Sequence, residues 1–130
     1  MLGRPVPTPP LVTVVDDSES VRESLPDLLQ QVGLAVRTFS TAEAFLASDA
    51  LDATACLVLD VALQGMSGPD LQHELRRGGK TIPIVFITGQ SDRSLRPRLL
   101  AAGAVACLFK PFSDSALIEA IEFAVGRRSA

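Results

Sequence analysis

Short apolar runs alternate with amphipathic stretches along most of the chain. Several runs are rich in β-branched residues and apolar throughout, which is typical of strands covered on both faces of a sheet. The runs predict five strands, over Leu11–Val15, Ala35–Phe39, Cys56–Leu59, Ile82–Thr88 and Val105–Phe109. Because amphipathic segments separate them, the pattern predicts parallel strands joined by helices.

The amphipathic stretches predict five helices. Apolar residues recur at helical spacing over Glu19–Val32, where Pro26 predicts a kink. Ser40 and Glu43 form a candidate capping box for a short second helix through Leu46. The others are expected over Ser67–Arg77, over Arg96–Ala102, and from an N-cap at Ser113 toward Val125. Five strand–helix units predict an α/β fold with a doubly wound sheet and helices on both faces.

Composition and charge are those of a single globular domain. The 130 residues are 47% hydrophobic and 21% charged, unlike disordered chains. A formal net charge of −3 gives no overall positive field to attract nucleic acid. No apolar run approaches the roughly 18 residues of a membrane span, and Cys56 and Cys107 lack metal-type spacing. We therefore expect a cytoplasmic protein that binds neither nucleic acid nor membrane directly.

The two ends of the chain differ from its middle. Residues 1–10 are rich in proline and are expected to form an extended or disordered tail. One folded domain is expected over 11–126. Residues 127–130 are expected to be a tail or the start of a linker.

Polar residues follow four of the five predicted strands. Asp16 and Asp17 follow the first strand, Asp60 ends the third, Thr88 ends the fourth, and Lys110 follows the fifth. Each alone has a structural explanation as a helix cap, a turn residue or a solvated charge. Together they are expected at the carboxyl edge of the sheet, where doubly wound proteins bind ligands. Three converging carboxylates imply a hard cation such as magnesium.

This set of residues also suits phosphoryl transfer. Carboxylates form aspartyl-phosphates, and the transfer mainly requires alignment and charge neutralisation. The sequence supplies a carboxylate, a metal site, the Thr88 hydroxyl and the compact Lys110 cation. Gly89 leaves room for a donor to approach.

Four motifs carry a resemblance to a known family. They are Val-Val-Asp-Asp at 14–17, Leu-Val-Leu-Asp at 57–60 followed by Gly-Met-Ser-Gly at 65–68, Phe-Ile-Thr-Gly at 86–89, and Phe-Lys-Pro-Phe at 109–112. In this order and at these separations they resemble the receiver domain of bacterial two-component response regulators. The resemblance covers about Leu11 to Val125 and implies a flavodoxin-like sheet with strand order 2-1-3-4-5.

The resemblance implies a role for each site residue. Asp60 would be the phosphoacceptor, Asp17 a direct ligand of Mg²⁺ or Mn²⁺, Asp16 a holder of metal-bound water, and the backbone carbonyl of Ala62 a further ligand. Thr88 and Lys110 would contact the phosphoryl group, with a cis bond between Lys110 and Pro111. Such a chain is not an enzyme for other substrates, since it catalyses only its own phosphorylation and dephosphorylation.

The resemblance also implies partners. A sensor histidine kinase or a phosphotransfer protein would donate the phosphoryl group, and the surface of the fourth helix and fifth strand would then change to control a partner, a homodimer or an output domain. The string from Gly65 to Leu71 and the Phe-Ile-Thr-Gly segment resemble receivers with a helix-turn-helix DNA-binding output. The sequence leaves open whether this chain is a piece of a longer regulator or a stand-alone receiver.

The signalling surface is where the sequence departs most from the family. Cys107 stands where the family usually has a switching Tyr or Phe, and Phe109 follows two residues later. Pro97 predicts that the regular fourth helix begins close to it, which leaves Ser91–Leu95 as a mobile loop. Gln64 replaces a common proline and predicts a looser loop after Asp60.

Two further positions bear on how long a phosphoryl group would last. The resemblance implies that Ala62 and Gln90 flank the path of attacking water, and these side chains predict slow hydrolysis. The lone His73 lies on the third predicted helix and receives no phosphodonor role.

Three other functions fit parts of this sequence pattern. A phosphatase of the haloacid-dehalogenase type needs an acid two residues after its nucleophile, where this chain has Ala62. A flavin-binding protein needs a phosphate loop after the first strand, which the sequence lacks. The serious alternative is a receiver-like binding module that contacts a partner without being phosphorylated.

Overall fold

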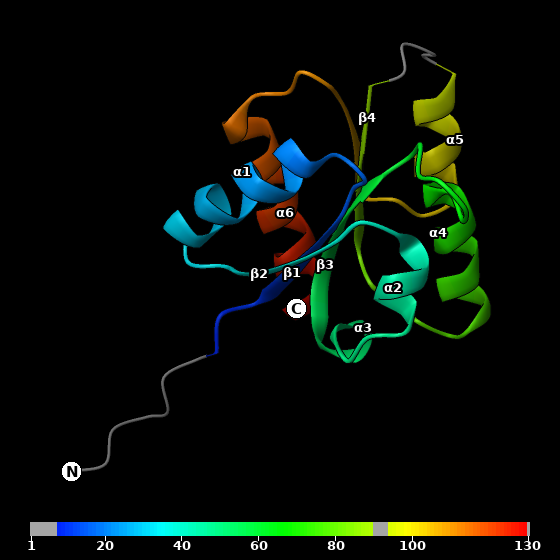
Figure 1. Ribbon diagram of the computed structural model, residues 1–130, viewed down its shortest axis with the longest axis horizontal. Helices are drawn as coiled ribbons and strands as arrows, with labels where there is room; N and C mark the ends of the chain where they lie inside the picture. The colour runs from blue at the N-terminus through cyan, green and yellow to red at the C-terminus, as the bar shows by residue number, and fades with distance from the viewer. Residues whose placement is uncertain (1–7, 90–93, 130) are drawn as a thin grey trace.

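A computed structural model describes residues 8–89 and 94–129 of the chain. Its centre is a five-stranded parallel sheet with the order β2-β1-β3-β4-β5, which confirms the predicted fold (Figure 1). The strands are β1 Leu11–Val15, β2 Ala35–Phe39, β3 Thr54–Asp60, β4 Ile84–Thr88 and β5 Ala106–Phe109.

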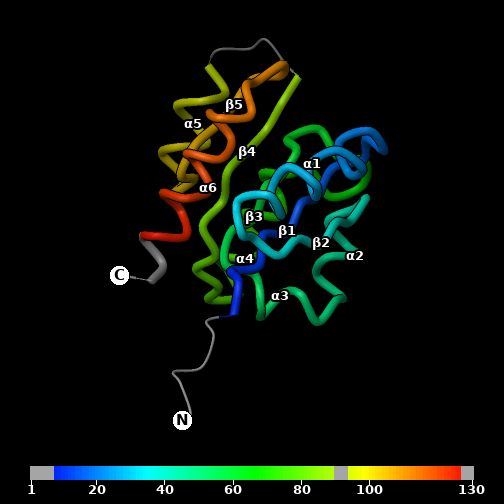
Figure 2. Tube along the Cα trace, turned by 90° about the vertical axis from the view of Figure 1, so that its left-hand side faces the viewer, coloured from blue at the N-terminus to red at the C-terminus, as the bar shows by residue number. Residues whose placement is uncertain are grey.

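Helices cover both faces of the sheet (Figures 1 and 2). One face carries α1 Glu19–Gln31 and α6 Asp114–Ser129. The other carries α2 Ala42–Leu46, α3 Ala50–Ala53, α4 Gly68–Arg77 and α5 Leu95–Ala101. None of the described helices is both long and apolar enough to cross a membrane.

The central strands divide their side chains between two apolar cores. Leu57 and Leu59 of β3 pack with α2, α4 and α5, while Cys56 and Val58 pack with α1 and α6. All four side chains are fully buried. Successive side chains of a strand point to opposite faces, so a strand buried on both sides is apolar at every position. The uninterrupted apolar runs of the sequence have this cause.

The structure corrects several predicted boundaries. Strand β3 is longer than predicted at both ends, and α3 was not predicted because its four residues are too few for a helical period. Strand β4 begins at Ile84 rather than Ile82. The intervening Pro83 has no amide to donate, although its carbonyl accepts from the amide of Leu57 at 2.9 Å. Helix α1 runs through Pro26. Helix α6 continues to Ser129, so residues 127–129 are helical.

The predicted capping box at the start of α2 is wrong. Thr41 is the N-cap, and its hydroxyl accepts from the amide of Ala44 at 3.0 Å. Glu43 is therefore the second helical residue, one position too early to close a box on the N-cap. Its carboxylate instead accepts from the amide of Met66, on the loop between β3 and α4, at 3.0 Å.

Helix α5 begins at Leu95, so the predicted loop over Ser91–Leu95 is wrong at its last residue. Leu95 is buried and anchors the helix in the core, while Pro97 lies in the first turn, where its missing amide costs no hydrogen bond. Ser91 and Gln90 lie outside the described residues, as does 1–7 of the predicted tail.

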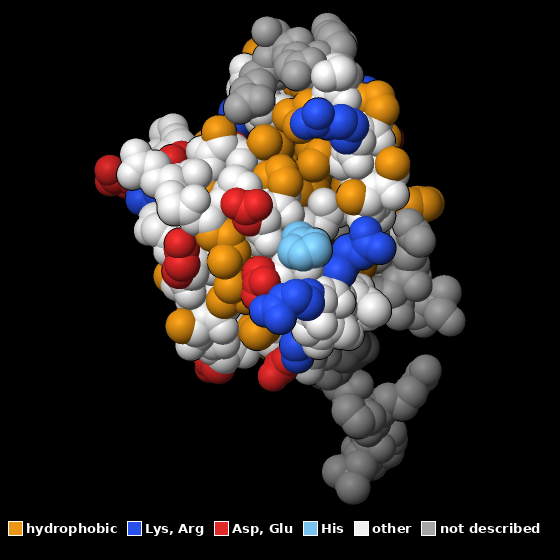
Figure 3. Space-filling model, turned by 90° about the vertical axis from the view of Figure 1, so that its right-hand side faces the viewer, with side chains coloured by type: hydrophobic (Ala, Val, Ile, Leu, Met, Phe, Trp, Pro, Cys, Tyr) orange, Lys and Arg blue, Asp and Glu red, His pale blue; other side chains and the backbone are white. Residues whose placement is uncertain are grey.

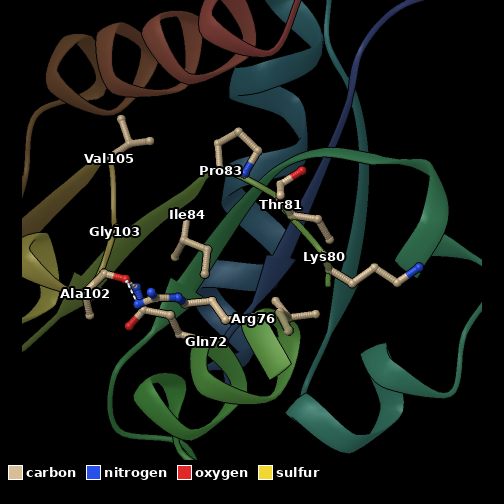
Figure 4. Close-up of a pocket in the computed structure, with 11 residues that line it drawn as sticks. Gln72, Arg76, Lys80, Thr81, Pro83, Ile84, Ala102, Gly103 and Val105 are labelled. Atoms are coloured by element: carbon tan, nitrogen blue, oxygen red, sulfur yellow. Dashed lines mark hydrogen bonds between the residues drawn. The ribbon is translucent and has the colours of Figure 1, made fainter. Parts of the chain in front are cut away.

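The carboxyl end of α5 is fastened to α4. The backbone carbonyl of Ala102, the C-cap residue of α5, accepts from Arg76 Nη1 at 2.7 Å and from Gln72 Nε2 at 3.3 Å (Figure 4). A cation at a helix C-terminus also meets the negative end of the helix dipole. This pair of bonds fixes where α5 ends relative to α4.

Candidate functional site

The strand register brings the predicted polar residues to one edge of the sheet. Val15 pairs with Leu59, so the residues that follow them in sequence, Asp16 and Asp60, lie at the same level. Asp60 pairs with Ile87, the residue before Thr88, and Thr88 pairs with Phe109, the residue before Lys110. Parallel pairing therefore gathers all these residues at the carboxyl edge.

Three carboxylates form the centre of the site. Asp16, Asp17 and Asp60 each offer an oxygen, and these oxygens all lie within 4.8 Å of one another. Asp16 is fully buried, Asp60 is 5% exposed and Asp17 is exposed. One carboxylate of the cluster thus faces solvent while two are held inside.

The Asp16 carboxylate is held on both sides. Its Oδ1 accepts from the amide of Ser18 at 2.8 Å, and its Oδ2 accepts from Lys110 Nζ at 3.1 Å. Arg22 Nη1 donates to the Asp16 backbone carbonyl at 2.9 Å. Both carboxylate oxygens therefore have protein partners, which leaves Asp17 as the more available carboxylate.

Asp60 sits in a less favourable environment for a negative charge. Its Oδ1 accepts from the amide of Ala62 at 3.3 Å, and its Oδ2 lies 3.9 Å from Lys110 Nζ. Burial and then the neighbouring Asp16 charge raise the pKa of Asp60 from 3.8 to about 6, against the opposing influence of Lys110 and the Ala62 amide. The site therefore gains from any ligand that adds positive charge.

Lys110 is placed by the backbone around it. Its amide donates to the carbonyl of Thr88 at 2.8 Å, and the bond from Lys110 to Pro111 is cis. The Lys110 ammonium reaches two carboxylates of the cluster. Thr88 is fully buried at the end of β4.

The loop from Asp60 to α4 is packed tightly against the end of β3. The amide of Gly68 donates to the carbonyl of Val61 at 3.0 Å, and a side chain at Gly68 would collide with the Asp60 carbonyl. Ser67 and Asp70 form a complete capping box at the start of α4. Only glycine allows the helix to begin this close to Asp60.

The donor set fits a hard divalent cation. Carboxylate and carbonyl oxygens are the ligands that Mg²⁺ and Mn²⁺ take in proteins. Asp17 and Ala62 are exposed and Asp60 is nearly buried, and the crowding of three carboxylates gives the cation an electrostatic reason to bind.

Of the residues predicted for switching, those that the structure describes belong to α5 and β5, and among them Phe109 directly precedes Lys110. Cys107 is 1% exposed in β5, where burial raises the pKa of its thiol, and Phe109 is partly buried at the end of the same strand. Leu95 is buried in α5 and Pro97 is exposed. The predicted fourth helix and fifth strand thus correspond to α5 and β5.

Two hollows lie next to α4, away from the carboxylates. One, of about 700 Å³, is at the amino edge of β4 and β5. Arg76 is bonded there to the Ala102 carbonyl (Figure 4), and Lys80 is paired with Asp52. The other runs between α4 and α5, on a face where basic and apolar side chains mix (Figure 3). Neither contains the acidic groups that the proposed chemistry requires.

The structure brings most of the predicted site residues together, and it adds one contact that the sequence did not indicate. Asp16, Asp17, Asp60 and Lys110 are brought together as predicted. The role of Glu43 was missed, because its spacing from Ser40 resembled a local cap. The Gly65-Met66 turn that it contacts is the only sequence signal for this contact, and it does not identify the partner.

The chain is similar to known proteins over nearly its whole length. Residues 12–122 match the family model described as Response regulator receiver domain. Nodulation protein W of Bradyrhizobium diazoefficiens is 47% identical over 120 residues, which are 92% of this chain and 53% of that protein. Transcriptional regulatory protein FixJ of Azorhizobium caulinodans is 40% identical over 116 residues, which are 89% of this chain and 55% of that protein.

A solved structure gives the same result. That of the response regulator StyR has a TM-score of 0.86 and 44% identity, and the match covers 93% of this chain and 61% of that one. The chain spans about half the length of the curated relatives that it matches.

Proposed function

The chain belongs to the family of response regulator receiver domains of two-component systems, and on this premise we propose that Asp60 is its phosphoacceptor. The observation that carries the proposal is the position of Asp60, a 5%-exposed carboxylate beside Asp16, Asp17 and Lys110 at the carboxyl edge of the sheet. An oxygen of Asp60 would form the new bond to phosphorus. The donor's bond to phosphorus would break, and its electron pair would leave with the donor.

Each neighbouring residue has one part in this step. Lys110 lies 3.9 Å from Asp60 Oδ2, close enough for its ammonium to pair with an oxygen of the transferred group. Thr88, at the end of β4, would donate its hydroxyl to another of these oxygens. Gly68 lets the start of α4 lie against the backbone of Asp60.

Asp17, Asp60 and the Ala62 carbonyl would hold Mg²⁺ or Mn²⁺ directly. Asp16 would act through water, since both of its carboxylate oxygens already accept bonds from the protein. The cation, when bound, neutralises the crowded carboxylates and the oxygens of the phosphoryl group. Burial and the neighbouring Asp16 charge raise the pKa of Asp60, so added positive charge favours its ionised form.

The donor would be a sensor histidine kinase or a phosphotransfer protein. The consequence of phosphorylation would be a change in the surface of α5 and β5, which would then control a partner, a homodimer or an output domain. A role in transcription is supported by the similarity to FixJ, which is named a transcriptional regulatory protein. Cytoplasmic location is supported by two buried free thiols, Cys56 and Cys107.

The experiment is incubation with acetyl phosphate, followed by intact-mass measurement. We expect one phosphate mass in Mg²⁺, none in chelator, and none for Asp60→Asn in either condition. The matched control is Asp114→Asn, which removes an exposed acid at the start of α6 and should still be phosphorylated. Phosphate on Asp60→Asn would refute the assignment. A complete failure of the wild-type chain to react would favour the unphosphorylated binding module.

A further inference from the structure

Glu43 lies on α2, outside the carboxylate cluster, but its side chain reaches the loop that follows Asp60. Its Oε2 accepts from the amide of Met66 at 3.0 Å. Next to this bond, Gly65 has a φ of +74°, and a Cβ built there would lie 2.7 Å from the same Glu43 oxygen. The turn at Gly65 and the carboxylate of Glu43 therefore fit each other closely.

The contacted loop is coupled to Asp60 at its beginning. The amide of Val61 donates to the carbonyl of Ile87 at 3.0 Å and continues the β3–β4 ladder. The amide of Ala62 donates to Asp60 Oδ1 at 3.3 Å. The Ala62 peptide group thus connects the path of the loop to the Asp60 carboxylate.

The far end of the loop is fixed separately. Gly68 is bonded to Val61, and Ser67 is locked in the α4 capping box. Between the two ends, Leu63 is buried in the core and Met66 is partly buried against it. These apolar contacts hold the loop near α2, but they set no direction for its peptide groups. The Glu43–Met66 bond supplies that direction.

We propose that Glu43 is a positioning residue for the metal and phosphoryl site. By holding the Gly65–Met66 turn, it keeps the loop in the path in which the Ala62 carbonyl and the Asp60 carboxylate face the same cation. This inference rests on the proposed function, because it assigns a purpose to the loop geometry around Asp60.

The first test measures Mg²⁺ binding by calorimetry for Glu43→Ala, Glu43→Gln and a control, Glu119→Ala. Glu119 is an exposed acid on α6, so its loss changes the net charge equally. We expect Glu43→Ala to weaken Mg²⁺ binding by about threefold to tenfold. Glu43→Gln keeps an oxygen acceptor and should stay within about twofold of wild type. The control should bind as wild type does.

A second measurement separates positioning from a general loss of structure. In the absence of metal, hydrogen exchange at the Met66 amide should be faster in Glu43→Ala than in wild type, whereas exchange in β1 and β3 should be the same. Faster exchange throughout the sheet would mean that Glu43 supports the fold as a whole, and it would overturn the proposal.

A third test uses Gly65→Ala, whose added Cβ would push the Glu43 carboxylate away. We expect Gly65→Ala to weaken Mg²⁺ binding in the wild-type background and to add less than about a twofold further loss in the Glu43→Ala background. An equal loss in both backgrounds would show that the strained φ alone is responsible, and would overturn the proposal.

The outcomes separate this inference from the proposed function. Unchanged Mg²⁺ affinity in Glu43→Ala, together with phosphorylation that depends on Asp60, would overturn the role of Glu43 and leave the receiver function intact. Phosphorylation of Asp60→Asn would instead overturn the proposed function.

Discussion

The two ends of strand β3 bury polar groups in different ways. At its amino end, Thr54 is fully buried, and its hydroxyl lies 2.7 Å from the Thr13 hydroxyl and donates to the Ala50 carbonyl at 2.6 Å. At its carboxyl end, Asp60 is nearly buried among two other carboxylates. No buried side-chain nitrogen or oxygen in the described part of the chain lacks a hydrogen-bond partner. Hydrogen bonding is therefore satisfied at both ends.

What differs is the balance of charge. The Thr54 end is neutral, and its buried hydroxyls are already hydrogen-bonded within the protein. It therefore contributes to stability and presents no polar group to a ligand. At the Asp60 end, Lys110 pairs with Asp16 and Asp60, and the third carboxylate of the cluster, Asp17, is exposed. Buried charge without full compensation costs stability in the free protein. A bound cation would offset this loss of stability, so the same strand can be stable and still respond to a ligand at its carboxyl end.

The largest effect is expected from pH. The raised pKa of Asp60, about 6 against 3.8, means that the folded state binds more protons than the unfolded state between these values. Stability from this group therefore falls as pH rises from about 4 to about 6, by at most about 3 kcal/mol. Asp60→Asn should remove this fall and be the more stable protein at pH 7.5 without divalent ions. Urea unfolding at pH 4.5 and 7.5 measures it; a less stable Asp60→Asn at pH 7.5 would contradict it.

The next effect comes from adding the cation. Magnesium at a hundred times its dissociation constant should raise the free energy of unfolding at pH 7.5 by about 2.7 kcal/mol. Thr54→Val should keep this gain, since it changes only the neutral end of the strand. Asp17→Asn should lose most of it at the same concentration. Thermal unfolding with and without Mg²⁺ tests both, and an equal gain in Asp17→Asn would remove Asp17 from the site.

At the neutral end of β3, we expect a loss of stability from an unpaired buried hydroxyl rather than from a buried charge. Thr54→Val leaves the buried Thr13 hydroxyl without its partner, so it should cost about 2 kcal/mol of stability at any pH. Adding Thr13→Val removes the orphaned hydroxyl and should recover part of the loss, because the Ala50 carbonyl still lacks the donor that Thr54 supplied. If the double variant is as unstable as the sum of the single ones, the hydroxyl pair is not the cause.

The smallest effect is expected at Cys107. Its thiol is buried and uncharged, so it resembles the Thr54 end more than the Asp60 end. Cys107→Ala should change the response of α5 and β5 to beryllofluoride by less than about twofold, because a thiol has little surface to bury or expose. Cys107→Tyr should enlarge the response by supplying a ring. Hydrogen exchange in α5 and β5 with and without beryllofluoride is the measurement, and a lost response in Cys107→Ala would make the thiol part of the switch.

The sequence predicts the sheet and the acidic site because both depend on local patterns. A strand buried on both faces must be apolar at every position, and parallel strands must end at one edge, so Asp16, Asp60 and Lys110 converge whatever the detailed packing. The helix over Gly68–Arg77 is equally local, since its capping box is contained in four residues.

The remaining features depend on distant partners. The Glu43 side chain bonds to a residue 23 positions away, and the Thr13 and Thr54 hydroxyls are 41 positions apart. A side chain that fits two partners is assigned to the nearer one when only the sequence is known. The short helix α3 is missed for a different reason, because its four residues are too few to show an apolar period.

The two hydrogen bonds at the Ala102 carbonyl hold the carboxyl end of α5 in place relative to α4. Arg76 and Gln72 of α4 donate these bonds, so a tilt of α5 that keeps them turns about its carboxyl end. Seven residues span about 10 Å, so a tilt of about 10° displaces the far end by roughly 2 Å. The far end is Leu95, on the side of the carboxylate edge. A tilt about the Ala102 end would therefore move Leu95 most, and because Leu95 is buried, such a tilt would have to repack the core around it.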